Sequence, residues 1–325
     1  MILHHNKELF QDAVQATAQH LSIPEVYIEK DYWVSLVLCK IFSSRISDQI
    51  VFKGGTSLSK CYGLIQRFSE DIDLVILRNE GETDNQLKKR IRTISKIVDK
   101  ILPEKHIEGL TNKRGNIRKT AHQYENIFDE NLGQVAELLV LEATWLGNFE
   151  PYNIQNVSSY IYDFMSLQRQ DSLIEEYGME PFNVQALSVE RTFCEKIMSL
   201  VRFSYTEDPI TMLPNKVRHI YDLHLMLKNR DIFSFFNCDA FYKMLLKVGQ
   251  DDFISFKNNN EWLKQHPSSA IIFQSPKEVW SPINKAYQRS FKRMVFGQLP
   301  NEADLLASLK KIGKRIQPIN WQISS

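Results

Sequence analysis

Cysteine is scarce in this sequence and follows no recognisable pattern. The four cysteines of the 325-residue chain are far apart, and no two of them form a C-x-x-C pair. That spacing fits neither a disulfide framework nor a zinc site. We therefore expect reduced thiols, most of them buried.

Long apolar runs are also missing. The first thirty residues include His4, His5, Lys7, Glu8 and Asp12, so they lack the apolar core of a signal peptide. Charges interrupt every later apolar stretch well before the roughly 18 residues that a membrane-spanning helix needs. The sequence predicts a soluble, cytoplasmic protein that does not bind a membrane.

The chain has no excess of charge of one sign. It contains 40 Lys and Arg against 39 Asp and Glu, a net charge of +1. Overall charge therefore gives no argument for a nucleic-acid partner, which would need a local basic patch. Hydrophobic residues make up 43% of the chain, enough for one large or two ordinary folded domains.

Apolar periodicity predicts a mixed first half and a helical second half. In the first half we expect helices over residues 6–21, from Pro24 to the forties, 57–64 and 86–101, and strands over 50–52, 71–77, 114–125, 135–146 and 158–164. After a turn-rich stretch, 168–183, we expect helices over 189–203, 217–228, 240–248, 276–293 and 302–316. These patterns predict an α+β protein with a domain over 1–170 and a mainly helical domain over 171–325.

The segment FKGGTSLSK places a glycine pair between a strand and a helix. Gly54 and Gly55 allow close backbone approach to a ligand, and a helix N-terminus attracts phosphate. We expect Thr56 to cap that helix. The segment is not a Walker A loop, because the second glycine before the lysine is absent.

The segment DIDLVIL alternates like a half-buried strand, which places Asp71 and Asp73 on the same face. Two ionised carboxylates about 4 Å apart repel by roughly 4 kcal/mol at an effective dielectric near 20. A divalent cation offsets that repulsion, and Mg²⁺ prefers carboxylates together with substrate phosphates. A D-x-D triplet also arises by chance, so the argument depends on its nearness to the glycine turn.

Glu142 lies in the apolar segment LVLEATW, where a carboxylate is costly to bury without a partner. A metal-binding or general-base role would explain it. Glu137 is a rival on the opposite face of the same expected strand.

Two later helices carry further candidates. Lys196 could neutralise a triphosphate or could simply be solvated. Asp222 is four residues from Arg218, so the pair could form an intrahelical salt bridge or join the active site. His219 and His224 have a spacing that suits no helical metal pair, so we interpret both as structural or surface residues.

These segments together resemble the AbiEii/AbiGii nucleotidyltransferase toxins of bacterial abortive-infection toxin–antitoxin pairs. The resemblance extends over most of the chain, in the order VYIEKDYWVSLVL, FKGGTSLSKCYGLIQRFSEDIDL, LEATW, VERTFCEKIMSL and VRHIYDLHLML. It implies a polymerase-β-like nucleotidyltransferase mixed sheet with flanking helices, joined to a C-terminal helical domain that completes the active site.

The resemblance also implies roles for individual residues. Asp71 and Asp73 would bind Mg²⁺, and Lys196 and Asp222 match an essential lysine and aspartate of the family. Glu142 matches a third carboxylate. Gly55 and Ser57 would hold nucleotide phosphate, in a nucleotide-binding turn that also includes Gly54 and Thr56. The partner implied is an antitoxin with a DNA-binding domain, with no stable complex assumed.

The leading hypothesis is a toxin that transfers a nucleoside monophosphate from an NTP to an RNA acceptor, the 3′ end of tRNA, and so inhibits growth. Lys196 would position the triphosphate, and Asp222 or Glu142 would assist the acceptor or the metal. The alternatives are transfer to a protein or small molecule, and nucleotide or RNA binding without chemistry. The sequence leaves the NTP, the acceptor and the oligomeric state open.

Overall fold

The chain divides into two compact units in a computed structural model, which describes residues 1–69, 71–113, 115–128, 138–147, 149–256 and 259–323. Unit 1 comprises Met1–Cys61 and Phe68–Leu187, and unit 2 comprises Tyr62–Arg67 and Ser188–Ser325. The sequence placed the domain boundary after residue 170. The division falls later because residues 182–187 form a strand of the unit 1 sheet.

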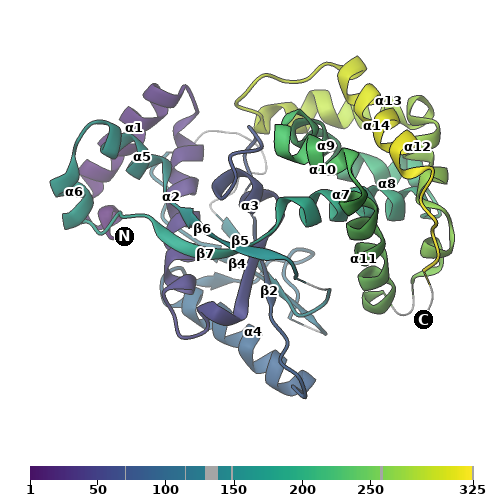
Figure 1. The fold of residues 1–325 in the computed structure, drawn as a ribbon. Coiled ribbons are helices and arrows are strands. Elements are labelled where there is room, and N and C mark those ends of the chain that lie inside the picture. The colour runs from purple at the N-terminus through teal and green to yellow at the C-terminus, as the bar shows by residue number, and fades with distance from the viewer. Residues whose placement is uncertain (70, 114, 129–137, 148, 257–258, 324–325) are drawn as a thin grey trace. The chain divides into compact units, whose positions relative to one another are not determined.

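In the described part of unit 1, the strands form one seven-stranded mixed sheet in the order β3-β4-β5-β2-β1-β7-β6 (Figure 1). Parallel pairing joins β1 to β7 and β2 to β5, and the other neighbours are antiparallel. The strands are β1 Ile50–Lys53, β2 Asp71–Ile76, β3 Glu104–Lys105, β4 Ile117–Gln123, β5 Leu138–Thr144, β6 Tyr152–Val157 and β7 Phe182–Leu187.

Two long helices of unit 1, α2 and α4, pack against each other and against the sheet. The alternation of β2 supplies one apolar face to this core, since Ile72, Leu74 and Ile76 are at most 1% exposed. The helices of unit 1 are α1 Lys7–Leu21, α2 Glu25–Phe42, α3 Gly54–Lys60, α4 Asp84–Asp99, α5 Tyr160–Leu167 and α6 Asp171–Glu176.

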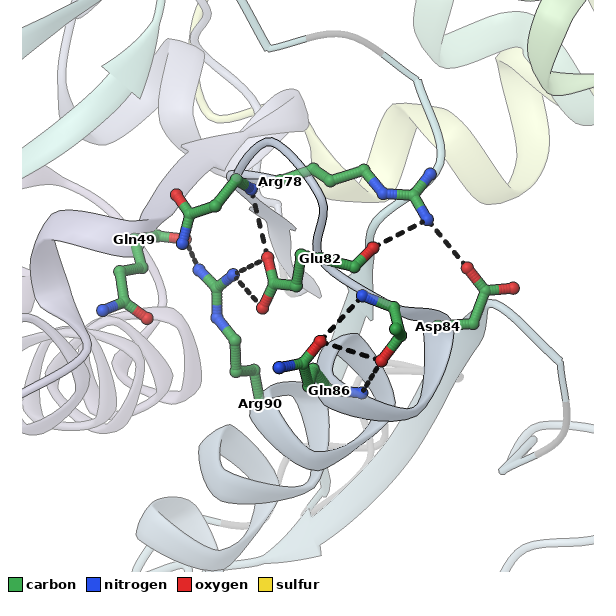
Figure 2. Close-up of polar contacts among 8 residues, drawn as sticks. Gln49, Arg78, Glu82, Asp84, Gln86 and Arg90 are labelled. Atoms are coloured by element: carbon green, nitrogen blue, oxygen red, sulfur yellow. Dashed lines mark hydrogen bonds and ion pairs between the residues drawn. The ribbon is translucent and has the colours of Figure 1, made fainter.

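The start of α4 is fixed by a dense set of polar contacts (Figure 2). Thr83 and Gln86 form a capping box, which satisfies amide groups that a helix start leaves unpaired. Arg90 donates to both carboxylate oxygens of Glu82, at 2.8 and 2.6 Å, and Arg78 donates to Asp84 at 2.8 Å. The helix is therefore held in place at the point where it begins.

Unit 2 is helical in its described residues. Its core includes Phe193, Phe236 and Phe241, all at most 1% exposed. The helices are α7 Val189–Ser204, α8 Pro209–Met212, α9 Val217–Lys228, α10 Arg230–Asn237, α11 Asp239–Ser255, α12 Ile271–Gln274, α13 Pro276–Ala286 and α14 Glu302–Ile316. After α13 the chain continues as a π-helical turn, Tyr287–Phe291, and a 3₁₀ turn, Lys292–Met294. Other short 3₁₀ turns of the chain are Leu3–His5, Ser47–Gln49, Leu213–Lys216, Glu261–Lys264 and Pro267–Ser269.

The structure confirms the α+β fold class but corrects some local predictions. The strand predicted over 158–164 is wrong, because Ser159 accepts a hydrogen bond from the Tyr162 amide and starts helix α5 there. The strands on either side of α5, β6 and β7, were not predicted. Thr56 does not cap α3, which begins at Gly54 with Lys53 as its N-cap residue and ends at Lys60.

The four cysteines are free thiols, as expected, but only Cys194 is buried and Cys238 is exposed. The prediction that most of them are buried is therefore wrong. Within the ranges that the structure describes, no helix combines the length and the apolar character needed to cross a membrane.

Candidate active site

The turn between β1 and α3 requires glycine at its first position. Gly54 has a φ of +82°, which side-chain-bearing residues rarely adopt. A Cβ at this position would lie 2.1 Å from Oδ2 of Asp73. Gly54 therefore lets the backbone of the turn approach the Asp73 carboxylate closely.

The next two residues of the turn are buried and join it to β2. Thr56 is 1% exposed, and its hydroxyl donates to the backbone carbonyl of Asp71 at 2.5 Å. Ser57 is 2% exposed, whereas Gly54 and Gly55 are half-buried. The glycines are thus the part of the turn that a phosphate could approach, and Thr56 fixes the distance between the turn and the first carboxylate.

A row of four charged residues crosses the middle of the sheet in register. Lys53 of β1 pairs with Asp73 of β2, Asp73 pairs with Glu142 of β5, and Glu142 pairs with Lys119 of β4. Directly paired residues lie on the same face of a sheet. The two carboxylates therefore lie side by side with a lysine on each outer side, and Lys119 Nζ is 3.6 Å from Glu142 Oε2.

Burial, and after it the negative charges of Glu142 and Asp71, raise the pKa of Asp73 to about 7, against the opposite effect of Lys53 and Lys119. Taking a carboxylate out of water and placing it near like charges both disfavour ionisation. The pKa of Asp73 thus lies near neutral pH. A cation bound at Asp71 and Asp73 would remove this penalty.

The donor set suits a divalent metal that also binds substrate. Among the described residues, no three or more metal-binding side chains come together as a complete site. Mg²⁺ usually takes one or two carboxylates plus substrate phosphate and water, rather than an all-protein cage. Asp71 and Asp73, beside an open glycine turn, fit that requirement.

Glu142 is the candidate for a third carboxylate of the site. Glu142 is beside Asp73 through the β2–β5 register. Glu137, its rival in the sequence, lies outside the described residues.

A buried ion pair fixes the far end of α3. The Asp31 carboxylate of α2 accepts from Lys60, the last residue of α3, and the two side chains are 6% and 5% exposed. The same carboxylate accepts the Tyr160 amide at 2.8 Å. Asp31 therefore connects α2 with the nucleotide-turn helix and with the start of α5.

Three consecutive charged residues of α2 are buried rather than solvated. Glu29, Lys30 and Asp31 are at most 6% exposed. Glu29 accepts the amides of Ile127 and Phe128, at 2.8 and 3.2 Å. Three consecutive charges inside an otherwise apolar helix were the signal that could have revealed these contacts.

Unit 2 contains a second charged cluster, centred on Asp222 of α9. Arg67 donates to both carboxylate oxygens of Asp222, at 2.7 and 2.8 Å, and Lys196 of α7 donates at 2.8 Å. Arg67, Asp222 and Lys196 are 3%, 0% and 5% exposed. Burial alone would raise the pKa of Asp222, but Arg67 and Lys196 together hold it well below its usual range.

The cluster excludes one of the two interpretations of Lys196 that the sequence left open. The interpretation of Lys196 as a solvated lysine is wrong, because the side chain is buried against Asp222. Arg67 was missed, since nothing in its neighbourhood marks it as the partner of a residue 155 positions away. The two histidines of α9 differ from Lys196 and Arg67 in that they take no part in these two ion pairs with Asp222. His224 is buried and forms a hydrogen bond with Ser308 at 2.8 Å. Burial lowers the pKa of His219 well below 6.5.

Comparison with known proteins identifies a protein family that this chain matches. Residues 36–311 match the family described as nucleotidyl transferase AbiEii toxin, type IV toxin–antitoxin system. The structure is similar to that of MenT4, a nucleotidyltransferase toxin from Mycobacterium tuberculosis, with a TM-score of 0.58 and 15% sequence identity. That match covers 94% of this chain and 90% of the other. No curated protein sequence matches the chain.

Proposed function

Because the chain belongs to the AbiEii family of nucleotidyltransferase toxins of type IV toxin–antitoxin systems, we propose that it transfers a nucleoside monophosphate from an NTP to the 3′ end of an RNA acceptor of the tRNA class. The observation that carries this proposal is the contact between the glycine turn and Asp73 of β2. In this proposal it brings the turn that holds phosphate next to the strand that holds the metal. Addition to tRNA would stop translation and growth, which places the reaction in the cytoplasm.

Asp71 and Asp73 hold Mg²⁺ in this proposal. The metal, when bound, supplies positive charge to the phosphate oxygens of the nucleotide. Gly54 and Gly55 offer backbone approach to the same phosphates, and Thr56 and Ser57 support the turn from its buried side. Glu142 shares the Asp73 site as the third carboxylate, and Lys53 and Lys119 limit the excess negative charge there.

The transfer itself forms a bond between the acceptor hydroxyl oxygen and the α-phosphorus, and it breaks the bond from that phosphorus to the β-phosphate bridging oxygen. Pyrophosphate leaves with the bonding electron pair, and the hydroxyl proton is lost to a carboxylate or to water. Positioning and charge stabilisation account for most catalysis of this kind. Glu142 is a candidate acceptor for the proton.

We assign Lys196 to the triphosphate and Asp222 to holding Lys196. The hydrogen bond to Asp222 fixes the direction of the Lys196 ammonium group, which suits a phosphate-binding cation. Arg67 provides the second positive partner of Asp222 and keeps that carboxylate ionised. The cognate antitoxin, with its DNA-binding domain, is the proposed protein partner, and no stable complex is required.

The test incubates the purified protein with each labelled NTP, Mg²⁺ and total tRNA, and follows the label on a denaturing gel. We expect the label at the tRNA 3′ end, and a loss of at least about 100-fold for Asp71→Asn and Asp73→Asn. Asp12→Asn, an exposed carboxylate on α1, is the matched control and should keep full activity.

Other outcomes separate the alternatives. Label on protein or on a small molecule would replace the RNA acceptor. If no acceptor is labelled and Asp71→Asn still inhibits cell growth, the protein acts by binding rather than by chemistry.

A further inference from the structure

A basic pocket lies in unit 1, beside the exposed side of α4. It has a volume of about 270 Å³, and its walls come from α4, from the chain leading into β4 and from the end of β5. Four of its lining residues are cations and none is a carboxylate: Lys88, Arg92, Lys113 and Arg118. The rest of the lining is apolar or glycine: Ile91, Gly115, Ile117 and Trp145.

The cations of this pocket are only partly neutralised. Glu104 is the carboxylate that reaches two of them: it contacts Lys113 and lies 3.7 Å from Arg118. Lys88 and Arg92 are exposed, one helical turn apart on α4, with no ion pair among the described residues. Among the residues that the structure describes, one carboxylate against four cations leaves a local excess of positive charge in a chain whose net charge is only +1.

The two elements that carry most of the pocket cations, α4 and β4, are fixed by hydrogen bonds and ion pairs. Arg118 donates to Ser95 of α4 at 2.7 Å, which fixes the strand against the helix. The beginning of α4 is fixed by its capping box and by the Arg90–Glu82 pair (Figure 2). A phosphate would thus meet positive charges whose backbone positions are already set.

The pocket and the candidate active site lie on opposite faces of the same sheet, and β4 contributes a residue to each. Arg118 and Lys119 are consecutive residues of β4, so their side chains point to opposite faces of the sheet. Arg118 lines the pocket, whereas Lys119 contacts Glu142 in the charged row. β4 is two strands from β2, about 10 Å at the usual strand spacing.

We propose that this pocket binds backbone phosphate of the acceptor RNA, close to the end that reaches Asp71 and Asp73. This inference rests on the proposed function, because it names how the same reaction holds its acceptor. Beyond β4 the described chain adds only short segments, since β3 is two residues long and Asn112 pairs with Lys119 as an isolated bridge. RNA bound at the pocket would pass around this edge to reach the other face. The contact is to phosphate and carries no base specificity.

The test compares two double variants that remove the same charge. Lys88→Ala with Arg92→Ala removes two pocket cations, and Lys89→Ala with Lys100→Ala removes two exposed lysines of the same region that do not line it. Binding of labelled tRNA is measured by fluorescence anisotropy without NTP across a salt series, and KM for tRNA and for NTP is measured with Mg²⁺.

We expect the pocket variant to bind tRNA about threefold to tenfold more weakly, and its slope of log affinity against log salt to become shallower by about 1 to 2. KM for tRNA should rise while KM for NTP and the melting temperature stay unchanged. The control variant should behave like the wild type in every measurement.

The outcomes distinguish this inference from the proposed function. If the wild type labels tRNA and both double variants have its affinity and salt slope, the pocket assignment is wrong and the function stands. If the pocket variant raises KM for NTP instead, the pocket holds the nucleotide and the assignment is also wrong. If the wild type labels nothing while the pocket variant alone loses tRNA affinity, the pocket stands and the proposed reaction fails.

Discussion

At the residue scale, Asp73 lies beside Glu142 in the middle of a sheet, with Asp71 two positions before it on the same strand. Its close contact with the Gly54 backbone position leaves little room for water between them. Such a carboxylate costs stability in the metal-free chain, and the Mg²⁺ that we propose at Asp71 and Asp73 would offset this cost. Strained or repulsive groups of this kind are found where function requires them.

Asp73→Asn should stabilise the metal-free protein at alkaline pH. The pKa of Asp73, about 7, is above its ordinary value of 3.8, so ionisation costs stability as pH rises between these values, and the cost is complete above about pH 7. We expect a gain of about 1 to 2 kcal/mol at pH 8, after allowing for solvent screening, and little change near pH 4.5. Thermal melting in EDTA measures the stability change at each pH. Equal gains at pH 8 and pH 4.5 would contradict the raised pKa of Asp73.

At the element scale, the position of α3 depends on contacts with two other elements, strand β2 and helix α2. Its first residue is set by the close approach to Asp73, and its last residue, Lys60, is held by Asp31 of α2. Asp31 also accepts the first amide of α5, which explains why residues 160–167 are a helix despite their β-prone aromatic residues. Local propensity favoured a strand there, and capping contacts decided otherwise.

Removing either partner of the Asp31–Lys60 pair should destabilise unit 1 strongly. Asp31→Asn or Lys60→Met leaves the other charge buried, so each should cost about 3 kcal/mol in the free energy of unfolding. The double variant should cost less than the sum, by about 1 to 3 kcal/mol. Urea denaturation of the four proteins measures this coupling.

An exposed pair provides the comparison for that cycle. Lys7 and Glu125 also form an ion pair, but their side chains are 69% and 75% exposed. The same cycle with Lys7→Met and Glu125→Gln should give a coupling below about 1 kcal/mol. Additive effects of Asp31→Asn and Lys60→Met would contradict the proposed role of the buried pair.

At the scale of the whole molecule, each of the two units is built from two separate segments of the chain. The segment Tyr62–Arg67 lies between α3 and β2 in sequence but belongs to unit 2. Its contacts with α9 and with the chain after α13 hold it there. Arg67 pairs with Asp222 of α9, and the backbone carbonyl of Gln66 accepts the amide of Phe296 at 3.1 Å.

Asp222→Asn should weaken unit 2 in a pH-dependent way. The pKa of Asp222 is depressed by Arg67 and Lys196 against the effect of burial, so its contribution is present above about pH 4 and is lost as pH falls below that. We expect a loss of about 3 to 5 kcal/mol at pH 7, from two cations left without their carboxylate, and a smaller difference from wild type near pH 3.5.

Urea denaturation at the two pH values measures the effect of Asp222→Asn. Asp304→Asn, an exposed carboxylate near the start of α14, should change stability by less than about 0.5 kcal/mol. A loss that does not diminish on acidification would show that the carboxylate charge is not what stabilises the cluster.

The sequence by itself determined the features that are local in the chain. The glycine turn and the two aspartates are within twenty residues of each other, and strand alternation alone places Asp71 and Asp73 on one face. The long helices followed in the same way from apolar periodicity, so that α9 and α14 have the predicted bounds. Family motifs then identified the nucleotidyltransferase fold.

Only the tertiary structure decided which charges are buried and what they contact. The Asp31–Lys60 and Arg67–Asp222 pairs join positions 29 and 155 residues apart, and the pocket beside α4 depends on strand pairing. A charged residue looks the same in sequence whether it is solvated or paired, because desolvation depends on packing from other elements. For that reason Lys196 looked equally like a surface lysine, and Arg67 gave no signal at all.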